Sequence, residues 1–235
     1  MRNSSAKIVV AVLLLMICSS ATLAQDVRYS WFEISYVQQD IGKDGSMTDA
    51  LLDQTVALSA TDGSGIKFGA SLGTWHNLFV FMDFNSSDIN VDALITNNQG
   101  EFSDTDEFDF TAVRGGIGLK WSLTPKIDIF AAATYDSMDL DFGSFAGENF
   151  DTGAKDVGGM VGIRAMVRDK IELRAKVRYS GVGDVDLSTG ELDADTLFGV
   201  GFGYELIRGL SFTGDYESGQ FSSWWIGFRL DLDED

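Results

Sequence analysis

Charged and apolar residues alternate along residues 171–179, which read Ile-Glu-Leu-Arg-Ala-Lys-Val-Arg-Tyr. Successive side chains of a β-strand point to opposite sides, so this segment has one apolar face and one charged face. The charged face consists of Glu172, Arg174, Lys176 and Arg178. Charges that are withdrawn from water must be paired or hydrogen-bonded. The spacing therefore predicts either a buried network of ion pairs or a polar path for ions and small solutes.

Later segments offer partners for these charges. Gly199, Gly201 and Gly203 form a stripe without side chains, which leaves room for long basic groups, and Asp215 and Glu217 supply carboxylates beyond it. The predicted charge network contains Arg114, Arg164, Glu172, Arg174, Lys176, Arg178, Glu205, Asp215, Glu217 and Arg229.

The sequence offers no catalytic constellation. Its one histidine, His76, lies in a predicted turn at 74–77. Without a second histidine, the sites that barrel proteases and phospholipases use cannot be assembled. The glycine pattern at 199–203 lacks the strand–turn–helix setting of a nucleotide loop, and no Asp-x-Asp pair matches a calcium-binding loop. We therefore expect no catalytic residue, no metal ion and no cofactor.

The first residues are typical of a secretory leader. Arg2 and Lys7 precede an apolar run at 8–17, and small residues lead up to Ala24. We predict that residues 1–24 are a cleaved signal peptide and that residues 25–235 form one domain. A lipoprotein modified at Cys18 is an alternative, but Ile17 stands where a small residue is preferred. Cys18 is the sole cysteine, so no internal disulfide is expected in the mature chain.

Ten alternating segments follow the leader. We predict strands at 27–39, 64–74, 77–88, 106–121, 126–139, 155–168, 170–183, 194–206, 209–217 and 220–232. Short turns alternate with longer loops at about 40–63, 89–105, 140–154 and 184–193, as in outer-membrane barrels with periplasmic turns and extracellular loops. The predicted fold is all-β, a closed antiparallel up-and-down transmembrane barrel of ten strands with both termini in the periplasm. An eight-stranded barrel is the alternative.

The apolar faces of these segments would contact lipid. They include Leu173, Val177, Phe198, Phe202, Trp224 and Phe228. The charged faces would then line a lumen, which we expect to be plugged by salt bridges because side chains fill barrels of about eight strands. A narrow pore for ions or small solutes is the alternative. A soluble barrel that carries a lipid inside would require the reverse polarity.

From Tyr29-Ser-Trp-Phe-Glu onward, the chain resembles the OmpA/opacity-type family of small proteobacterial outer-membrane β-barrels, a porin family of the Gram-negative cell envelope. The stretch Asp62-Gly-Ser-Gly-Ile-Lys-Phe-Gly-Ala-Ser and the repeated Gly-x-Gly-aromatic strands carry the resemblance. It implies an integral outer-membrane protein; we expect no C-terminal peptidoglycan-binding domain. The last strand also resembles the signal that the barrel-assembly machinery recognises, through Gly227, Leu230 and Leu232.

Acidic residues dominate the predicted loops. The chain has 36 acidic and 17 basic residues, a formal net charge of −19, which disfavours nucleic acid as a partner. Carboxylates bind calcium and magnesium, so the loops offer contact with outer-membrane lipid and lipopolysaccharide through divalent cations. Ordinary solvated loops, whose charge limits aggregation, are the alternative. We predict a structural or surface-interaction role through these loops; no host or surface ligand is specified by the sequence.

Overall fold

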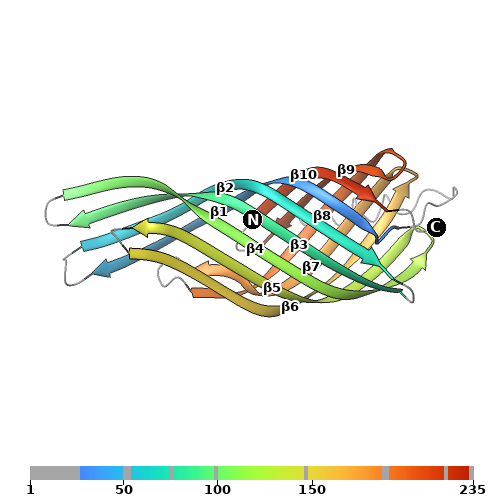
Figure 1. Ribbon diagram of the computed structural model, residues 1–235, viewed down its shortest axis with the longest axis horizontal. Helices are drawn as coiled ribbons and strands as arrows, with labels where there is room; N and C mark the ends of the chain where they lie inside the picture. Colours follow the sequence, from blue (N-terminus) through green and yellow to red (C-terminus); the bar gives the residue numbers. More distant parts are fainter. Residues whose placement is uncertain are drawn as a thin grey trace, which may run out of the picture.

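The computed structural model describes residues 27–49, 54–74, 77–97, 100–145, 148–186, 191–219 and 222–232. It is a closed antiparallel barrel of ten strands (Figure 1). The strands are β1 (Trp31–Asp49), β2 (Gln54–Gly73), β3 (Leu78–Asn97), β4 (Gly100–Thr124), β5 (Ile127–Phe145), β6 (Glu148–Arg168), β7 (Ile171–Asp186), β8 (Glu191–Ile207), β9 (Leu210–Ser218) and β10 (Ser222–Asp231). The predicted fold class and strand number are confirmed, and the eight-stranded alternative is wrong.

The barrel closes where its last strand pairs with its first. The β1–β10 ladder runs from Trp31↔Asp231 to Asp40↔Ser222, and the N–H of Leu232 donates to the carbonyl of Ser30 (2.8 Å). Both ends of the described chain thus lie at the end of the barrel that carries the connections β2–β3, β4–β5, β6–β7 and β8–β9. We call this the turn end and the opposite one the hairpin end.

The prediction of long loops is wrong, because most residues of these segments continue the strands. β1 and β2 pair from the turn end up to Asp49↔Gln54, β3 and β4 up to Asn97↔Gly100, and β5 and β6 up to Phe145↔Glu148. A bilayer-spanning strand needs only about 9–11 residues. β9 and β10 have 9 and 10 residues, whereas β4 has 25. The hairpins therefore project well beyond one bilayer thickness (Figure 1).

The polarity of the two strand faces inverts along the projecting hairpins. Near the turn end of β3, Val80 and Met82 are exposed on the outside of the barrel. Further along the same strand, Asp88 is exposed outside, whereas Ile89 and Val91 are buried inside. A barrel surrounded by lipid is apolar outside, and one surrounded by water is apolar inside. The hairpin end thus has the polarity of a water-soluble barrel, whereas the turn end has the polarity of a barrel that faces lipid.

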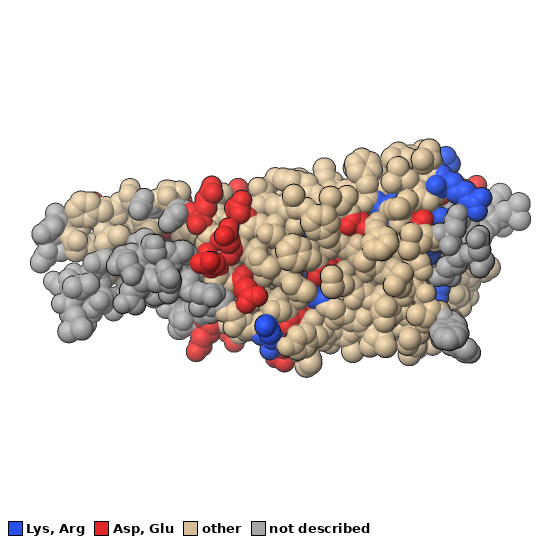
Figure 2. All heavy atoms as spheres, viewed as in Figure 1, with Lys and Arg blue, Asp and Glu red and all other residues tan. Residues whose placement is uncertain are grey.

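Charge follows the same division. Figure 2 shows acidic side chains in a band where the hairpins leave the barrel body, whereas basic side chains gather toward the turn end. Asp62, Asp88 and Asp109 are exposed carboxylates of the projecting part.

Within the described part of the chain, no helix is long and apolar enough to cross a bilayer. The predicted signal peptide and His76 lie outside the described residues.

Candidate functional site

The residues predicted to contact lipid lie on the outer face of the barrel. Phe198, Phe202, Trp224, Phe228 and Val177 are exposed, with 60% of Phe198 accessible, and Leu173 is half-buried. A row of aromatic rings crosses the outer faces of β8, β9 and β10: the ring centroids of Phe202 and Phe212 are 6.0 Å apart, and those of Phe212 and Phe228 are 5.9 Å apart.

Two residues of the predicted assembly signal belong to β10, and the third follows the end of that strand. Leu230 is exposed on the outer face of β10, Gly227 is buried facing β1, and Leu232 is half-buried just after the strand.

Glu172 is the centre of an ion-pair cluster near the turn end. It is only 3% exposed. Arg164 donates to both of its oxygens (3.1 and 2.9 Å), and so does Arg229 (3.3 and 3.0 Å). Arg174 lies 3.8 Å away, and Arg229 also contacts Asp231 at 2.9 Å. Two-pronged contacts of this kind are the strongest form of charge-assisted hydrogen bond.

The glycine stripe of β8 allows charges on β7 to reach carboxylates on β9. Arg174 pairs in register with Gly201, which pairs with Asp215, and the guanidinium of Arg174 lies 2.7 Å from the Asp215 carboxylate. A Cβ atom at Gly201 would lie 2.6 Å from the carboxylate carbon of Asp215, and one at Gly199 would lie 2.7 Å from Cε of Lys176. Side chains in this stripe would therefore block the bridges.

A second cluster lies closer to the hairpin end. Glu217 accepts from Lys176 at 2.8 Å and also pairs with Arg178. Arg178 is 3.7 Å from Asp136, whose other contact is a hydrogen bond from Ser180 (2.7 Å). On the opposite wall of the lumen, Arg114 on β4 pairs with Asp83 on the adjacent strand β3 at 3.0 Å.

The ring of Trp225 contacts two of the lumen lysines. Nζ of Lys67 lies 3.7 Å from the ring centre of Trp225, and Nζ of Lys176 lies 5.5 Å from it. Trp225 is 5% exposed and points into the lumen. Strand alternation predicts that Trp225 points into the lumen, but it does not predict that the ring binds cations.

The packed side chains divide the lumen into separate cavities. A cavity of about 120 Å³ toward the hairpin end and one of about 130 Å³ in the middle share Lys67, Asp83, Arg114 and Trp225 as their common wall. A space of about 20 Å³ at the turn end is bounded by Glu172 and Arg229. Glu205 lines this last space and accepts a hydrogen bond from the N–H of Gly209 (3.2 Å).

An apolar cluster that the sequence reasoning missed fills the lumen beyond the charges. It lies inside the projecting hairpins, most of whose residues are predicted from the sequence as acidic loops. The signal that indicates it is the continued alternation of apolar residues with aspartates along the supposed loops. Its buried members are Ile41, Ala60, Ile89, Val91, Phe108, Phe110, Met138, Leu140 and Val182.

Tyr29 forms an aromatic floor at the turn end. Its ring centroid lies 5.0 Å from that of Phe79, 4.5 Å from Nζ of Lys120 and 4.6 Å from the guanidinium carbon of Arg164. Burial raises the pKa of the Tyr29 phenol from 10.0 to about 12, although the positive charge of Arg164 acts in the opposite direction.

This pKa shift predicts a loss of stability in alkali. The unfolded chain ionises Tyr29 near pH 10.0, while the folded barrel keeps the phenol neutral, so the stabilisation is complete below pH 10 and is lost as the pH rises through about 12. Denaturant unfolding below pH 10 and at about pH 12 should show a smaller alkaline loss for Tyr29→Phe than for Tyr36→Phe, whose phenol is exposed on the outer face. An equal loss in both variants would disprove the assignment.

The described residues contain no group of three or more histidine, cysteine, aspartate or glutamate side chains placed to hold a metal ion. The contacts in the lumen support charge pairing, cation binding by aromatic rings, and enclosure of small volumes.

Comparison with known protein families assigns the chain to one of them. Residues 10–205 match the family described as outer membrane protein beta-barrel domain. No curated protein matches the chain.

Three solved structures resemble the chain at low sequence identity. The β domain of the Bordetella autotransporter BrkA has 13% identity and a TM-score of 0.47, covering 88% of this chain and 100% of that one. OprG from Pseudomonas aeruginosa has 10% identity and a TM-score of 0.44, covering 90% and 100%. Ail from Yersinia pestis, in complex with the heparin analogue sucrose octasulfate, has 10% identity and a TM-score of 0.42, covering 88% and 100%. On the family match, the chain belongs to the outer membrane protein β-barrel family and is an integral outer-membrane β-barrel.

Proposed function

We propose that this protein is a closed outer-membrane barrel with a structural or surface-interaction role, and that its lumen is a plug rather than a pore. The observation that carries the proposal is the succession of ion pairs through the lumen, from Glu172 near the turn end through Asp215 to Glu217. These groups are held within hydrogen-bonding distance of their partners, so an ion would have to break several buried pairs in sequence. Each broken pair costs about 3–5 kcal/mol.

The polarity of the barrel supports an orientation. Outer-membrane barrels keep short turns in the periplasm and extend their hairpins outside the cell. The turn end with both described termini would then be periplasmic, and the acidic hairpin end would be extracellular. The exposed carboxylates lie just beyond the apolar outer face (Figure 2). In this orientation they would be at the level where lipopolysaccharide phosphates meet water. We infer a diffuse contact with these phosphates through divalent cations, and assembly by the barrel-assembly machinery.

The family is generally non-enzymatic, and we extend this to the present chain. The ion-pair clusters use their carboxylates to neutralise guanidinium groups, so Glu172 and Glu217 are committed to partners. General acid–base chemistry needs a group that is free to exchange a proton with a substrate.

Planar-bilayer recording tests the plug. The refolded protein should give no stable conductance steps. The double variant Lys67→Ala, Trp225→Ala removes two of the four residues that form the wall between the two lumen cavities. It should increase the frequency of conducting events, which shows that the assay detects an opened lumen. Stable, large steps from the unaltered protein would overturn the plug and favour a narrow pore for ions or small solutes.

A further inference from the structure

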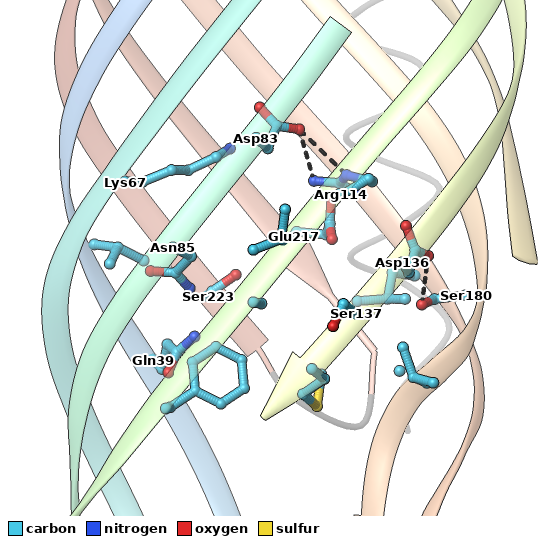
Figure 3. A pocket seen from close by; sticks show the side chains of 18 of the residues that line it. Gln39, Lys67, Asp83, Asn85, Arg114, Asp136, Ser137, Ser180, Glu217 and Ser223 are labelled. Atoms are coloured by element: carbon cyan, nitrogen blue, oxygen red, sulfur yellow. Dashed lines mark hydrogen bonds and ion pairs between the residues drawn. The ribbon is translucent and has the colours of Figure 1, made fainter. Parts of the chain in front are cut away.

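The hairpin-end cavity has an apolar wall and a polar floor (Figure 3). Phe108, Phe110 and Met138 line its outer part, and Arg114 and Asp136 belong to its inner part. Its volume of about 120 Å³ is close to the roughly 150 Å³ of an apolar protein cavity that accommodates benzene. The cavity is therefore large enough for one six-membered ring or a branched aliphatic group.

Among the described residues, three polar atoms of the cavity lining have neither a hydrogen-bond partner nor an ion-pair partner. They are Oε1 of Gln39, Oδ1 of Asp136 and Nη1 of Arg114. Gln39 is 7% exposed and Asp136 is 4% exposed. Leaving such buried groups unpaired is unfavourable, by about 1–3 kcal/mol each. Two of the atoms need a donor and one needs an acceptor, and a hydroxyl group can serve as both.

The charges around the cavity balance. Lys67, Arg114 and Arg178 are matched by Asp83, Asp136 and Glu217. A balanced lining favours an uncharged guest over an anion or a cation, because a net charge inside would add an uncompensated ion.

A break in the sheet lies beside this cavity. The β6–β7 ladder ends at Gly159↔Tyr179, although β6 continues to pair with β5 and β7 with β8 as far as Asp186↔Glu191. Ser180 and Val182, just beyond the break, line the cavity. Gly159 and Tyr179, at the break itself, line an open groove of about 770 Å³ on the apolar outer face.

Two glycines border this break, and other groups occupy the space beside them: the side chain of Asp156 lies against Gly181, and the backbone carbonyl of Tyr179 lies against Gly158. Gly158 and Gly181 lie on its two sides. Asp156, whose register partner Asp136 is buried, is exposed there. The cavity and the outer groove are thus separated by a seam that has no backbone ladder and in which the side chain of Asp156 lies against Gly181.

We propose that the hairpin-end cavity binds a small uncharged amphiphile, with an aromatic or branched aliphatic body and one hydroxyl group, and that the guest passes between the outer groove and the cavity through the β6–β7 seam. The apolar body occupies the space beside Phe108 and Met138, and the hydroxyl donates to Oε1 of Gln39. This binding is independent of ion flow, because the cavity ends at the Arg114–Asp83 wall.

Phenol and toluene are the probes. In the refolded barrel with labelled methionine methyl groups, phenol should shift the Met138 signal saturably, whereas Met82, which is 56% exposed on the outer face, should report only partitioning into detergent. Phenol should bind at least about tenfold more tightly than toluene, which cannot make the hydrogen bond. The absence of a saturable shift at Met138, or equal affinity for both probes, would overturn the site.

A matched pair of variants tests the polar contact. Gln39→Leu should weaken phenol binding by about tenfold and leave toluene binding unchanged. Gln38→Leu makes the same chemical change on the outer side of β1, where Gln38 bonds to Asp62, and should change neither. Equal effects of the two variants would contradict the assignment, and the phenol–toluene comparison on the unaltered chain remains decisive if a variant does not fold.

A reversible crosslink tests the seam. A Cβ atom at Gly181 would lie 2.6 Å from Cβ of Asp156, so a cysteine at each position can form a disulfide after a small outward shift. The sequence contains no other cysteine besides Cys18 in the predicted leader. Oxidation of the Asp156→Cys, Gly181→Cys variant should slow phenol exchange at Met138 by at least about tenfold, and reduction should restore it. Exchange that is unchanged on oxidation would overturn the seam as the route.

Discussion

Replacing Glu172 with glutamine is expected to lower the free energy of unfolding of the barrel by about 3–5 kcal/mol. The variant keeps the shape of the side chain but removes the negative charge that Arg164 and Arg229 both contact through two hydrogen bonds. Arg174 also loses a carboxylate at 3.8 Å. Because the site is buried, water cannot solvate the guanidinium groups that lose their partner. Denaturant unfolding of the refolded barrel in lipid vesicles measures the effect.

Two further variants make this result interpretable. Asp109→Asn removes a carboxylate from the outer face of β4, where both cross-strand neighbours, Asp88 and Asp141, are also acidic. It should change the stability by no more than about 0.5 kcal/mol, or raise it. Adding Arg164→Met to Glu172→Gln removes one of the uncompensated charges and should recover part of the loss. A Glu172→Gln barrel as stable as Asp109→Asn would contradict the plug.

The strands could be predicted because the alternation is strong wherever lipid lies on one side and charges on the other. The turn ends of the strands were predicted to within a few residues, as for β7 and β9. The hairpin ends of β1 to β6 were not, because aspartate, glycine and serine are common in turns and make these hairpin segments resemble loops. Ile89-Asn90-Val91-Asp92-Ala93, inside a predicted loop, nevertheless alternates, and so does Met138-Asp139-Leu140 at the edge of another. Their pattern is that of a strand whose apolar face has changed sides.

The candidate site divides along the same line. Alternation is enough to assign Arg174 and Glu217 to one side of their strands. It does not determine which carboxylate each cation meets, since that depends on the register Arg174↔Gly201↔Asp215 and on the space above the glycines. The cavities are less predictable still, because they depend on how Trp225 and Lys67 stack.

Replacing Gly227 with valine should prevent the barrel from closing. Gly227 pairs with Ser35 across the β1–β10 seam, and a Cβ atom there would lie 2.6 Å from Cα of Ser35 and closer still to the carbonyl oxygen of Ile34. These are backbone atoms, so the two strands would have to separate. An open edge inside a bilayer leaves backbone groups unpaired at several kcal/mol each. The folded, heat-modifiable form on a denaturing gel should therefore disappear.

Gly115→Val is the matched control, because the nearest atom to a Cβ at Gly115 is the Phe81 carbonyl oxygen at 4.0 Å. This variant should fold like the unaltered chain. Refolding into detergent without cellular factors then separates two reasons for a glycine at 227. If the glycine is needed to avoid a clash between β1 and β10, Gly227→Val abolishes folding in detergent. If the glycine is only recognised by the barrel-assembly machinery, the variant refolds normally in detergent and only its insertion in cells is reduced. We expect the first result, because the clash is with the backbone of β1 and exists whenever the barrel is closed.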